Sequence, residues 1–225
     1  MAIILNIETA TTNCSVSLSK SGETLILKED NSKSYSHAEN LHVFINVILK
    51  EAGITSKDLD AVAISKGPGS YTGLRIGVSA AKGLCFALDI PLISVPTLEA
   101  LAHQVDCNDG VIVAMLDARR LEVYAALFNS NYDEIRETEA EILDENAYTE
   151  YLNKSKVYFV GNGVEKTKGL INHPNAIFIE DKLPSASEMG VLAYNKYKIS
   201  DFEDVAYFEP YYLKDFVALK PKPKS

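Results

Sequence analysis

The chain has 225 residues, of which 47% are hydrophobic, and its formal net charge is −9 at pH 7. That is enough apolar material for one large domain or two small ones, so wholesale disorder is excluded. Nucleic-acid phosphates require clustered cations, so the acidic balance argues against this chain gripping a nucleic acid alone. The clearest basic cluster is a lysine- and proline-rich tail, expected to be disordered, with Lys214, Lys220, Lys222 and Lys224.

Neither a disulfide framework nor a zinc site is predicted, because Cys14, Cys85 and Cys107 form no C-x-x-C pair. The N-terminal segment lacks a basic region and reaches Asn6 and Glu8 at once, so no signal peptide is expected. No apolar run approaches the ~20 residues of a membrane span. We therefore expect a cytoplasmic protein without a membrane association.

The first part of the chain predicts a mixed α/β layer fold that begins with three antiparallel strands. A long helix then starts at Ser36, follows the helical spacing of apolar residues, and ends at Gly53. Val43 and Val47 form a second apolar strip on this helix, which is either the edge of the core or a contact with a partner. A shorter helix is expected from Thr97. The strands expected here are 3–7, 14–18, 25–27, 61–65 and 92–95.

A glycine-rich loop, GPGSYTGLRIG at 67–77, lies between a buried strand and a helix. Glycine permits positive φ, and Ser70 or Thr72 can cap the helix. Free N–H groups at a helix N-terminus often bind an anion. The spacing matches neither the P-loop nor G-x-G-x-x-G. Two interpretations stay open, a phosphate site that includes Gly67, Gly69 and Ser70, and a purely structural elbow.

The helix after this loop is apolar nearly all round. Between Leu74 and Leu88 its only charges are Arg75 and Lys82, a pattern typical of a helix buried on more than one side. Two internal glycines, at positions 77 and 83, each cost roughly 1 kcal/mol relative to alanine. That cost is tolerable where another backbone must come very close. The helix is either a central core helix or a subunit interface.

After residue 106 a new series of buried strands begins, which predicts a second subdomain. Charged residues dominate 133–145, and a helix is expected over 185–197. No close repeat relates the two halves, so any duplication would be structural only. Strands are expected at 111–116, 123–128 and 157–160. The predicted domains are 1–105, 106–214 and a flexible basic tail, 215–225.

Polar residues stand at two strand ends, where α/β sheets usually bind ligands. Glu8 ends the first strand and faces the turn at 9–13, where a carboxylate either positions a metal-bound phosphate or caps the turn. Asp117, Arg119 and Arg120 follow another buried strand. These three either touch a ligand or form a routine structural ion pair, and the ion pair is the favoured interpretation.

The histidines and serines predict no hydrolytic centre. His37 and His42 are five residues apart, which turns their side chains roughly 140° from one another on a helix, so no metal site is expected there. Ser15 and Ser70 have no histidine and acid that the sequence links to them, which argues against a serine hydrolase.

Taken together, several segments resemble the TsaB (YeaZ) family, in the right order and over most of the chain. They are ILNIET at 4–9 with CSVSL at 14–18, the glycine-rich block at 67–77, DARR with EVY at 117–124, and PSA at 184–186. The resemblance implies an actin-like, hexokinase-like ATPase fold (ASKHA, ribonuclease H-like) of two subdomains, the second reduced.

The family also implies a function in making threonylcarbamoyladenosine on tRNA, beside the anticodon. In that pathway a larger relative, TsaD, carries the metal, the nucleotide and the transfer chemistry, and the small ATPase TsaE joins. TsaB-type chains resemble non-catalytic partners that pair with TsaD through their first two long helices, here about 36–52 and 73–88. The chain alone is expected to form a homodimer, and to meet tRNA only indirectly. The expected interface residues are Val43, Val47, Leu74, Ile76, Gly77, Ala80, Ala81, Gly83 and Leu84.

The resemblance places no cofactor on the isolated chain and leaves ATP or ADP to the interface of the complex. Glu8 stands where the family commonly has Asp, which weakens independent ATP hydrolysis. A nucleotide-dependent transferase or kinase of the same fold is the alternative function; a metallopeptidase is disfavoured because H-x-x-x-H is absent. The residues expected near a nucleotide are Glu8, Thr9, Thr11, Gly67, Gly69, Ser70, Asp117, Arg119 and Arg120.

Overall fold

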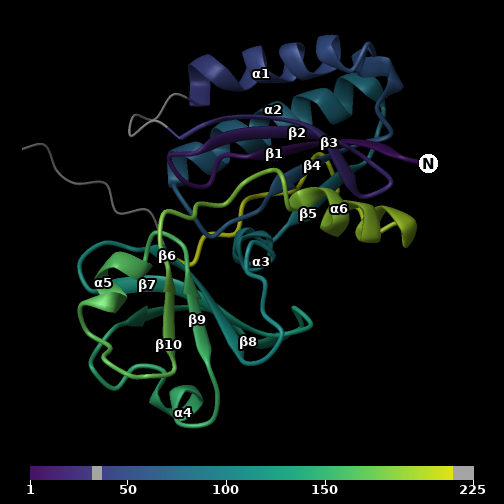
Figure 1. Ribbon diagram of the computed structural model, residues 1–225. Helices are drawn as coiled ribbons and strands as arrows, with labels where there is room; N and C mark the ends of the chain where they lie inside the picture. The colour runs from purple at the N-terminus through teal and green to yellow at the C-terminus, as the bar shows by residue number, and fades with distance from the viewer. Residues whose placement is uncertain (32–36, 215–225) are drawn as a thin grey trace, which may run out of the picture.

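A computed structural model describes residues 1–31 and 37–214 as two subdomains, each built on a five-stranded sheet (Figure 1). The first sheet has the order β3-β2-β1-β4-β5. Strand β1 pairs antiparallel with β2 and parallel with β4, so the antiparallel opening predicted from the sequence is confirmed. Its strands are β1 (Ile3–Glu8), β2 (Cys14–Lys20), β3 (Glu23–Asp30), β4 (Ala61–Ser65) and β5 (Leu92–Val95).

Helices cover both faces of this sheet, which is why β1 is apolar at nearly every position. On one face, Leu5 packs in a core cluster with Leu41 of helix α1 (His37–Glu51) and Val78 of helix α2 (Tyr71–Leu88). On the other face, the neighbouring Ile4 packs with Met189 of helix α6 (Met189–Lys198). A short 3-10 helix, η1 (Ser56–Asp58), leads into β4.

The second sheet repeats the strand topology of the first. Its order is β10-β9-β6-β7-β8, with β6 antiparallel to β7, β7 antiparallel to β8, and β6 parallel to β9. The duplication is therefore structural, without a repeat in the sequence. Helix α3 (Thr97–Ala102) lies between the two sheets (Figure 1). The remaining elements are β6 (Val111–Asp117), β7 (Glu122–Asn129), β8 (Glu134–Ile142), α4 (Thr149–Leu152), β9 (Val157–Val160), α5 (Val164–Lys168) and β10 (Ala176–Ile179).

After β10 the chain returns to the first subdomain. Met189 and Ala193 of α6 pack on the first sheet, and Glu203 bridges to Leu92 at its edge. Residues 185–214, which the sequence pattern assigns to the second subdomain, therefore belong to the first. The reason is that α1 and α2 cover only one face of the first sheet, and the apolar side of α6 covers the other (Figure 1).

The strand β8 was not predicted, because five of its nine residues are charged and it lies at the edge of its sheet. The predicted cap Ser36 and the predicted tail 215–225 lie outside the described residues. In the part of the chain that the structure describes, no helix combines the length and the apolarity needed to cross a membrane.

Candidate functional site

The glycine-rich block lets α2 lie directly on the turn that follows β1. An added Cβ at Gly73 or Gly77 would overlap atoms of Thr9, and one at Gly69 would lie 2.5 Å from the carbonyl oxygen of Ala10. The N-terminus of α2 is capped by Ser70, whose Oγ accepts a hydrogen bond from the backbone N–H of Gly73 at 3.3 Å. These glycines are thus needed for close packing, as the structural-elbow interpretation requires.

The inward face of α2 belongs to the core. Leu74 and Ala81 are fully buried, and Gly77 is buried against Thr9 and Ile64. The prediction that Leu74, Gly77 and Ala81 lie at a partner interface is therefore wrong, because all three point into their own subdomain. The core-helix interpretation therefore holds for the inward face of α2, while its outward face is exposed, with Phe86 85% exposed.

The outward face of α2 forms, with the start of α1, an open groove of about 750 Å³, here called the helix groove. Val43 of α1 is 54% exposed and Val47 is half-buried, although neither lines the groove. An added Cβ at Gly83 would meet no atom within 4 Å, so nothing in the described part of the chain requires glycine there. The lining residues are Ala38, His42, Tyr71, Thr72, Arg75, Ile76, Ser79, Ala80, Gly83 and Leu84.

Aromatic and cationic side chains mark one end of the helix groove. Arg75 donates a hydrogen bond to the hydroxyl of Tyr71 at 2.7 Å, and its guanidinium lies 5.1 Å from the centre of that ring. The ring of Tyr71 also packs against Tyr212, with 5.0 Å between centroids. Tyr71 lines the helix groove and a second hollow, and so connects the two sites.

The second hollow, of about 440 Å³, lies between the subdomains and is here called the cleft. It brings together Thr11, Gly69 and Ser70 from one side with Asp117 and Arg119 from the other. Glu8, Thr9, Gly67 and Arg120, also expected near a nucleotide, do not line it. Across the ranges 1–31 and 37–214, no three His, Cys, Asp or Glu side chains are grouped so that they could hold a metal ion.

Glu8 is fully buried beneath the turn rather than exposed to the cleft. Its Oε1 accepts hydrogen bonds from the backbone N–H of Ala10 at 2.5 Å and from the hydroxyl of Ser65 at 2.9 Å. The other oxygen, Oε2, is buried without a hydrogen-bond partner. Burial raises the pKa of this carboxyl from 4.5 to about 7, although the two hydrogen bonds oppose the shift. Glu8 therefore caps the turn, which was one of its two predicted roles.

His37 is structural as well. Its Nε2 donates a hydrogen bond to the carbonyl oxygen of Thr11 at 2.7 Å, and burial lowers its pKa. His42 lies on the exposed side of α1 and lines the helix groove, so the two histidines are not neighbours in a metal site.

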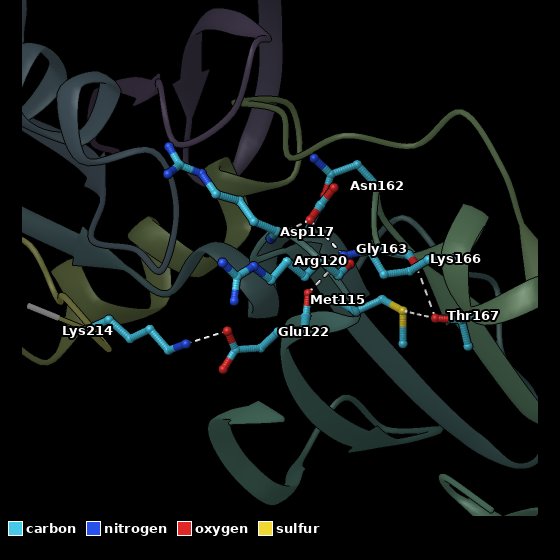
Figure 2. A network of polar contacts seen from close by, with 10 residues as sticks. Met115, Asp117, Arg120, Glu122, Asn162, Gly163, Lys166, Thr167 and Lys214 are labelled. Carbon is cyan, nitrogen blue, oxygen red and sulfur yellow. Dashed lines mark hydrogen bonds and ion pairs between the residues drawn. The ribbon is translucent and has the colours of Figure 1, made fainter. Parts of the chain in front are cut away.

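The loop between β6 and β7, residues 117–122, is fastened from one side by a single lysine. Nζ of Lys166 donates to Oδ1 of Asp117 at 2.7 Å and to the carbonyl oxygens of Arg120 and Glu122 at 2.7 and 2.9 Å (Figure 2). The predicted ion pair of Asp117 with an arginine is thus wrong, because Lys166 takes that carboxylate. Of the two arginines, Arg119 contacts Asp117 through its backbone N–H, which donates to Oδ1 at 2.6 Å, and not through its guanidinium.

A C-terminal strap, residues 203–214, crosses from the first subdomain to this loop. Lys82 of α2 donates to the carbonyl oxygens of Ala206 and Phe208 at 3.1 and 3.0 Å. The N–H of Tyr211 donates to the carbonyl oxygen of Lys66 at 2.6 Å. The strap ends where Lys214 forms an ion pair with Glu122 of the second subdomain (Figure 2). Its last four residues line the cleft and narrow the space for a ligand.

Comparison with known proteins identifies the family. The family model described as TsaD, tRNA N6-adenosine threonylcarbamoyltransferase, matches residues 31–222. The tRNA threonylcarbamoyladenosine biosynthesis protein TsaB of Escherichia coli is 32% identical over 98% of both chains. The TsaB of Buchnera aphidicola from Schizaphis graminum is 30% identical over 92% of this chain and 85% of its own. This chain belongs to the TsaB (YeaZ) family.

Solved structures agree with this assignment. The crystal structure of YeaZ from Pseudomonas aeruginosa has a TM-score of 0.79 at 26% identity and covers 95% of this chain and 100% of its own. A second structure from that organism, described as similar to peptidase YEAZ, has a TM-score of 0.83 at the same identity and coverage. The TsaB-family chain thus has the predicted actin-like, hexokinase-like ATPase fold, with only short helices on its second sheet.

Two parts of these sites were missed in the sequence. Lys166 lies 49 residues from Asp117 in a short helix, α5, and no local pattern links the two. The strap has a local signal, since three exposed or partly exposed tyrosines, Tyr207, Tyr211 and Tyr212, occur within six residues.

Proposed function

We propose that this chain is a non-catalytic subunit of the machinery that makes N6-threonylcarbamoyladenosine on tRNA in the cytoplasm. It binds a TsaD-type catalytic subunit through the helix groove. The relatives named TsaB and the matching TsaD family model support the pathway. The helix groove supports the proposed binding of the TsaD-type subunit.

The observation that carries the proposal is the outward face of α2 at Gly83. A glycine inside an 18-residue helix costs about 1 kcal/mol relative to alanine, and no atom of residues 1–31 or 37–214 lies near enough to explain it. Ala80, one turn earlier, is also small and lines the same groove. Small residues on one face let a second helix approach closely, which explains both positions if a partner helix occupies the groove.

The partner is proposed to be the TsaD-type subunit when it is present and a second copy of this chain when it is absent. A face that is self-complementary can form a two-fold dimer, and the same apolar surface then serves both assemblies. Ile76 and Leu84, half-buried in the chain alone, supply apolar contact in either case. TsaE is proposed to join the assembled pair.

The non-catalytic role rests on Glu8. A carboxylate that positions a metal-bound phosphate must reach the ligand, whereas Glu8 is held under the turn by Ala10 and Ser65. The strap further narrows the cleft with Tyr211 and Tyr212. ATP or ADP is therefore assigned to the interface of the complex, and no cofactor to this chain alone.

A nucleotide-dependent transferase or kinase remains the second candidate, because the N-terminus of α2 and Arg119 do face the cleft. Titration calorimetry of the isolated chain with ATP and Mg²⁺ separates the two functions. We expect no binding in the micromolar range. Micromolar binding that Ser70→Trp abolishes would favour the enzyme instead.

The pathway is tested by depleting the protein in its host and measuring threonylcarbamoyladenosine in bulk tRNA by nucleoside mass spectrometry. We expect the nucleoside to fall and to recover when the wild-type chain is expressed again. Expression of Gly83→Arg should leave the nucleoside low. An unchanged level after depletion, with no second copy of the gene, would contradict the proposed pathway.

A further inference from the structure

Arg119 and Arg120 lie side by side at the tip of the loop that Lys166 fastens. Both have left-handed backbone conformations, with φ of 73° and 53°, and both are exposed. Neither guanidinium has a hydrogen bond or an ion pair with any residue in 1–31 or 37–214. Two adjacent non-glycine residues in this conformation are costly, so the loop requires strong support.

That support comes from contacts that do not use the arginine side chains. Lys166 is mostly buried, with 16% of its side chain exposed, and holds the loop by three hydrogen bonds. The N–H of Asp117 also donates to Oδ1 of Asn162 at 2.8 Å. The two guanidinium groups are therefore presented outward from a fixed backbone.

The net positive charge of this loop comes from its two arginines, because its carboxylates are neutralised by lysines. Its carboxylates are both paired with lysines, Asp117 with Lys166 and Glu122 with Lys214 (Figure 2). Two positive charges remain, from Arg119 and Arg120. In a chain with a net charge of −9, these two guanidinium groups are a local excess of positive charge among the described residues.

We propose that Arg119 and Arg120 bind the phosphate backbone of RNA when this chain is assembled with its catalytic partner. The inference rests on the proposed function, which places the assembly on tRNA. A guanidinium presents a planar fork that matches phosphate oxygens in two hydrogen bonds. Contacts of this kind position the RNA and do not read its sequence.

The geometry favours an RNA backbone over a single nucleotide in the cleft. Arg119 lines the cleft, whereas Arg120 does not, so the pair extends across the rim of the cleft onto the outer surface. Of the two arginines, only Arg119 is among the residues that would surround a ligand held in the cleft. Successive phosphates of a polynucleotide reach both. The acidic remainder of the chain explains why the contact needs the partner, because repulsion weakens binding by the isolated subunit.

The test compares two double variants in the complex with the TsaD-type subunit. Arg119→Ala/Arg120→Ala removes the loop charges. Lys154→Ala/Lys156→Ala removes the same charge from exposed residues before β9, at the opposite end of the same sheet and about 20 Å away. Affinity for tRNA is measured at several salt concentrations, together with the affinity for ATP, complex formation, and the kcat and KM of the modification.

We expect the arginine variant to lose about tenfold in tRNA affinity, with a raised KM and an unchanged kcat. The plot of log affinity against log salt should become shallower by roughly one to two, since each phosphate contact contributes about 0.9. Arg119→Lys/Arg120→Lys should retain most of the salt slope. The lysine control should match the wild type.

Three results would overturn the inference. An unchanged tRNA affinity and salt slope in an intact complex would show that the arginines do not meet RNA. Loss of complex formation would assign them to an acidic surface of the partner protein, and a changed ATP affinity with normal tRNA binding would assign them to a nucleotide. If the wild-type chain forms no complex at all, the proposed function itself fails, and that result appears before any variant is tested.

Discussion

The hydroxyl of Thr9 donates a hydrogen bond of 2.9 Å to the carbonyl oxygen of Gly73, which joins the turn after β1 to the first turn of α2. The contact exists because Gly73 and Gly77 have no side chain to separate the two segments. Helix α2 is thereby pressed onto the sheet with one face, and its opposite face is left to form the helix groove. The face of α2 that packs on Thr9 and the face that carries Gly83 are opposite sides of the same helix.

The two internal glycines of α2 should respond to alanine in opposite ways. Gly77→Ala should destabilise the chain by about 1–3 kcal/mol, because its Cβ would overlap Oγ1 of Thr9 and approach Ile64 in a packed core. Gly83→Ala should stabilise it by up to about 1 kcal/mol, since the position is open and alanine is the better helix former. Urea unfolding of both variants checks this, and equal effects would contradict the assigned faces.

A large charged residue in the helix groove should prevent partner binding without unfolding the chain. Gly83→Arg places a guanidinium in the groove, while Ile199→Arg adds the same group to an exposed position at the end of α6, on the opposite face of the first sheet. Size-exclusion chromatography with the TsaD-type subunit should show loss of the complex for Gly83→Arg alone. If both variants bind normally, the groove is not the interface.

Glu8 should make the chain less stable as the pH rises toward 7. Its folded-state pKa, about 7, is above the unfolded value of 4.5, so the folded state binds more protons between these values. Stability is fully present below about pH 4.5 and is lost as the pH rises through 7, by up to about 3 kcal/mol.

Glu8→Gln removes this titration while keeping the shape and the acceptor for Ala10 and Ser65. Relative to the wild type, the variant should gain stability between pH 5 and pH 8 in urea unfolding. The difference between the two proteins cancels the titration of other groups, including His37, whose pKa burial lowers. A constant difference across this range would show that Glu8 does not titrate in it.

Lys166 should matter more to stability than a lysine in an exposed ion pair. Lys166→Met removes three hydrogen bonds that Nζ donates, two of them to backbone carbonyl oxygens, and should cost about 1–3 kcal/mol. Lys168→Met is the matched control on the same short helix, because the one partner of Lys168 among the described residues is the exposed Glu180. Its cost should be below about 1 kcal/mol. Thermal unfolding measures both, and a similar loss in the two variants would argue against a special role for Lys166.

The sequence predicted the first sheet well because its signals are local. Strands 61–65 and 92–95 are continuous apolar runs with turn residues at their ends, and the structure has them with the same bounds. Ser70 was one of two predicted caps and is the cap observed. The sequence analysis failed to predict β8 for the same reason, because an exposed edge strand needs no apolar pattern and so gives no local signal.

In the candidate sites, too, local sequence signals were predictive and long-range packing was not. The glycine block and the DARR segment, at 67–77 and 117–120, identified the family because both are specific over short stretches of sequence. Helical periodicity could not tell which side of α2 faces the sheet, because both sides are apolar. Leu74, Gly77 and Ala81 were accordingly assigned to the wrong face.

By itself, the sequence determined the fold class, the family and the positions of most strands and helices of the first subdomain, since these depend on residues close together in the chain. Only the tertiary structure decided that Glu8 is buried, that Lys166 takes Asp117 from the arginines, and that the C-terminal strap returns to narrow the cleft. Each of these depends on contacts between residues far apart in the chain. Such contacts form only when both sheets are folded and packed, so no local pattern of residues encodes them.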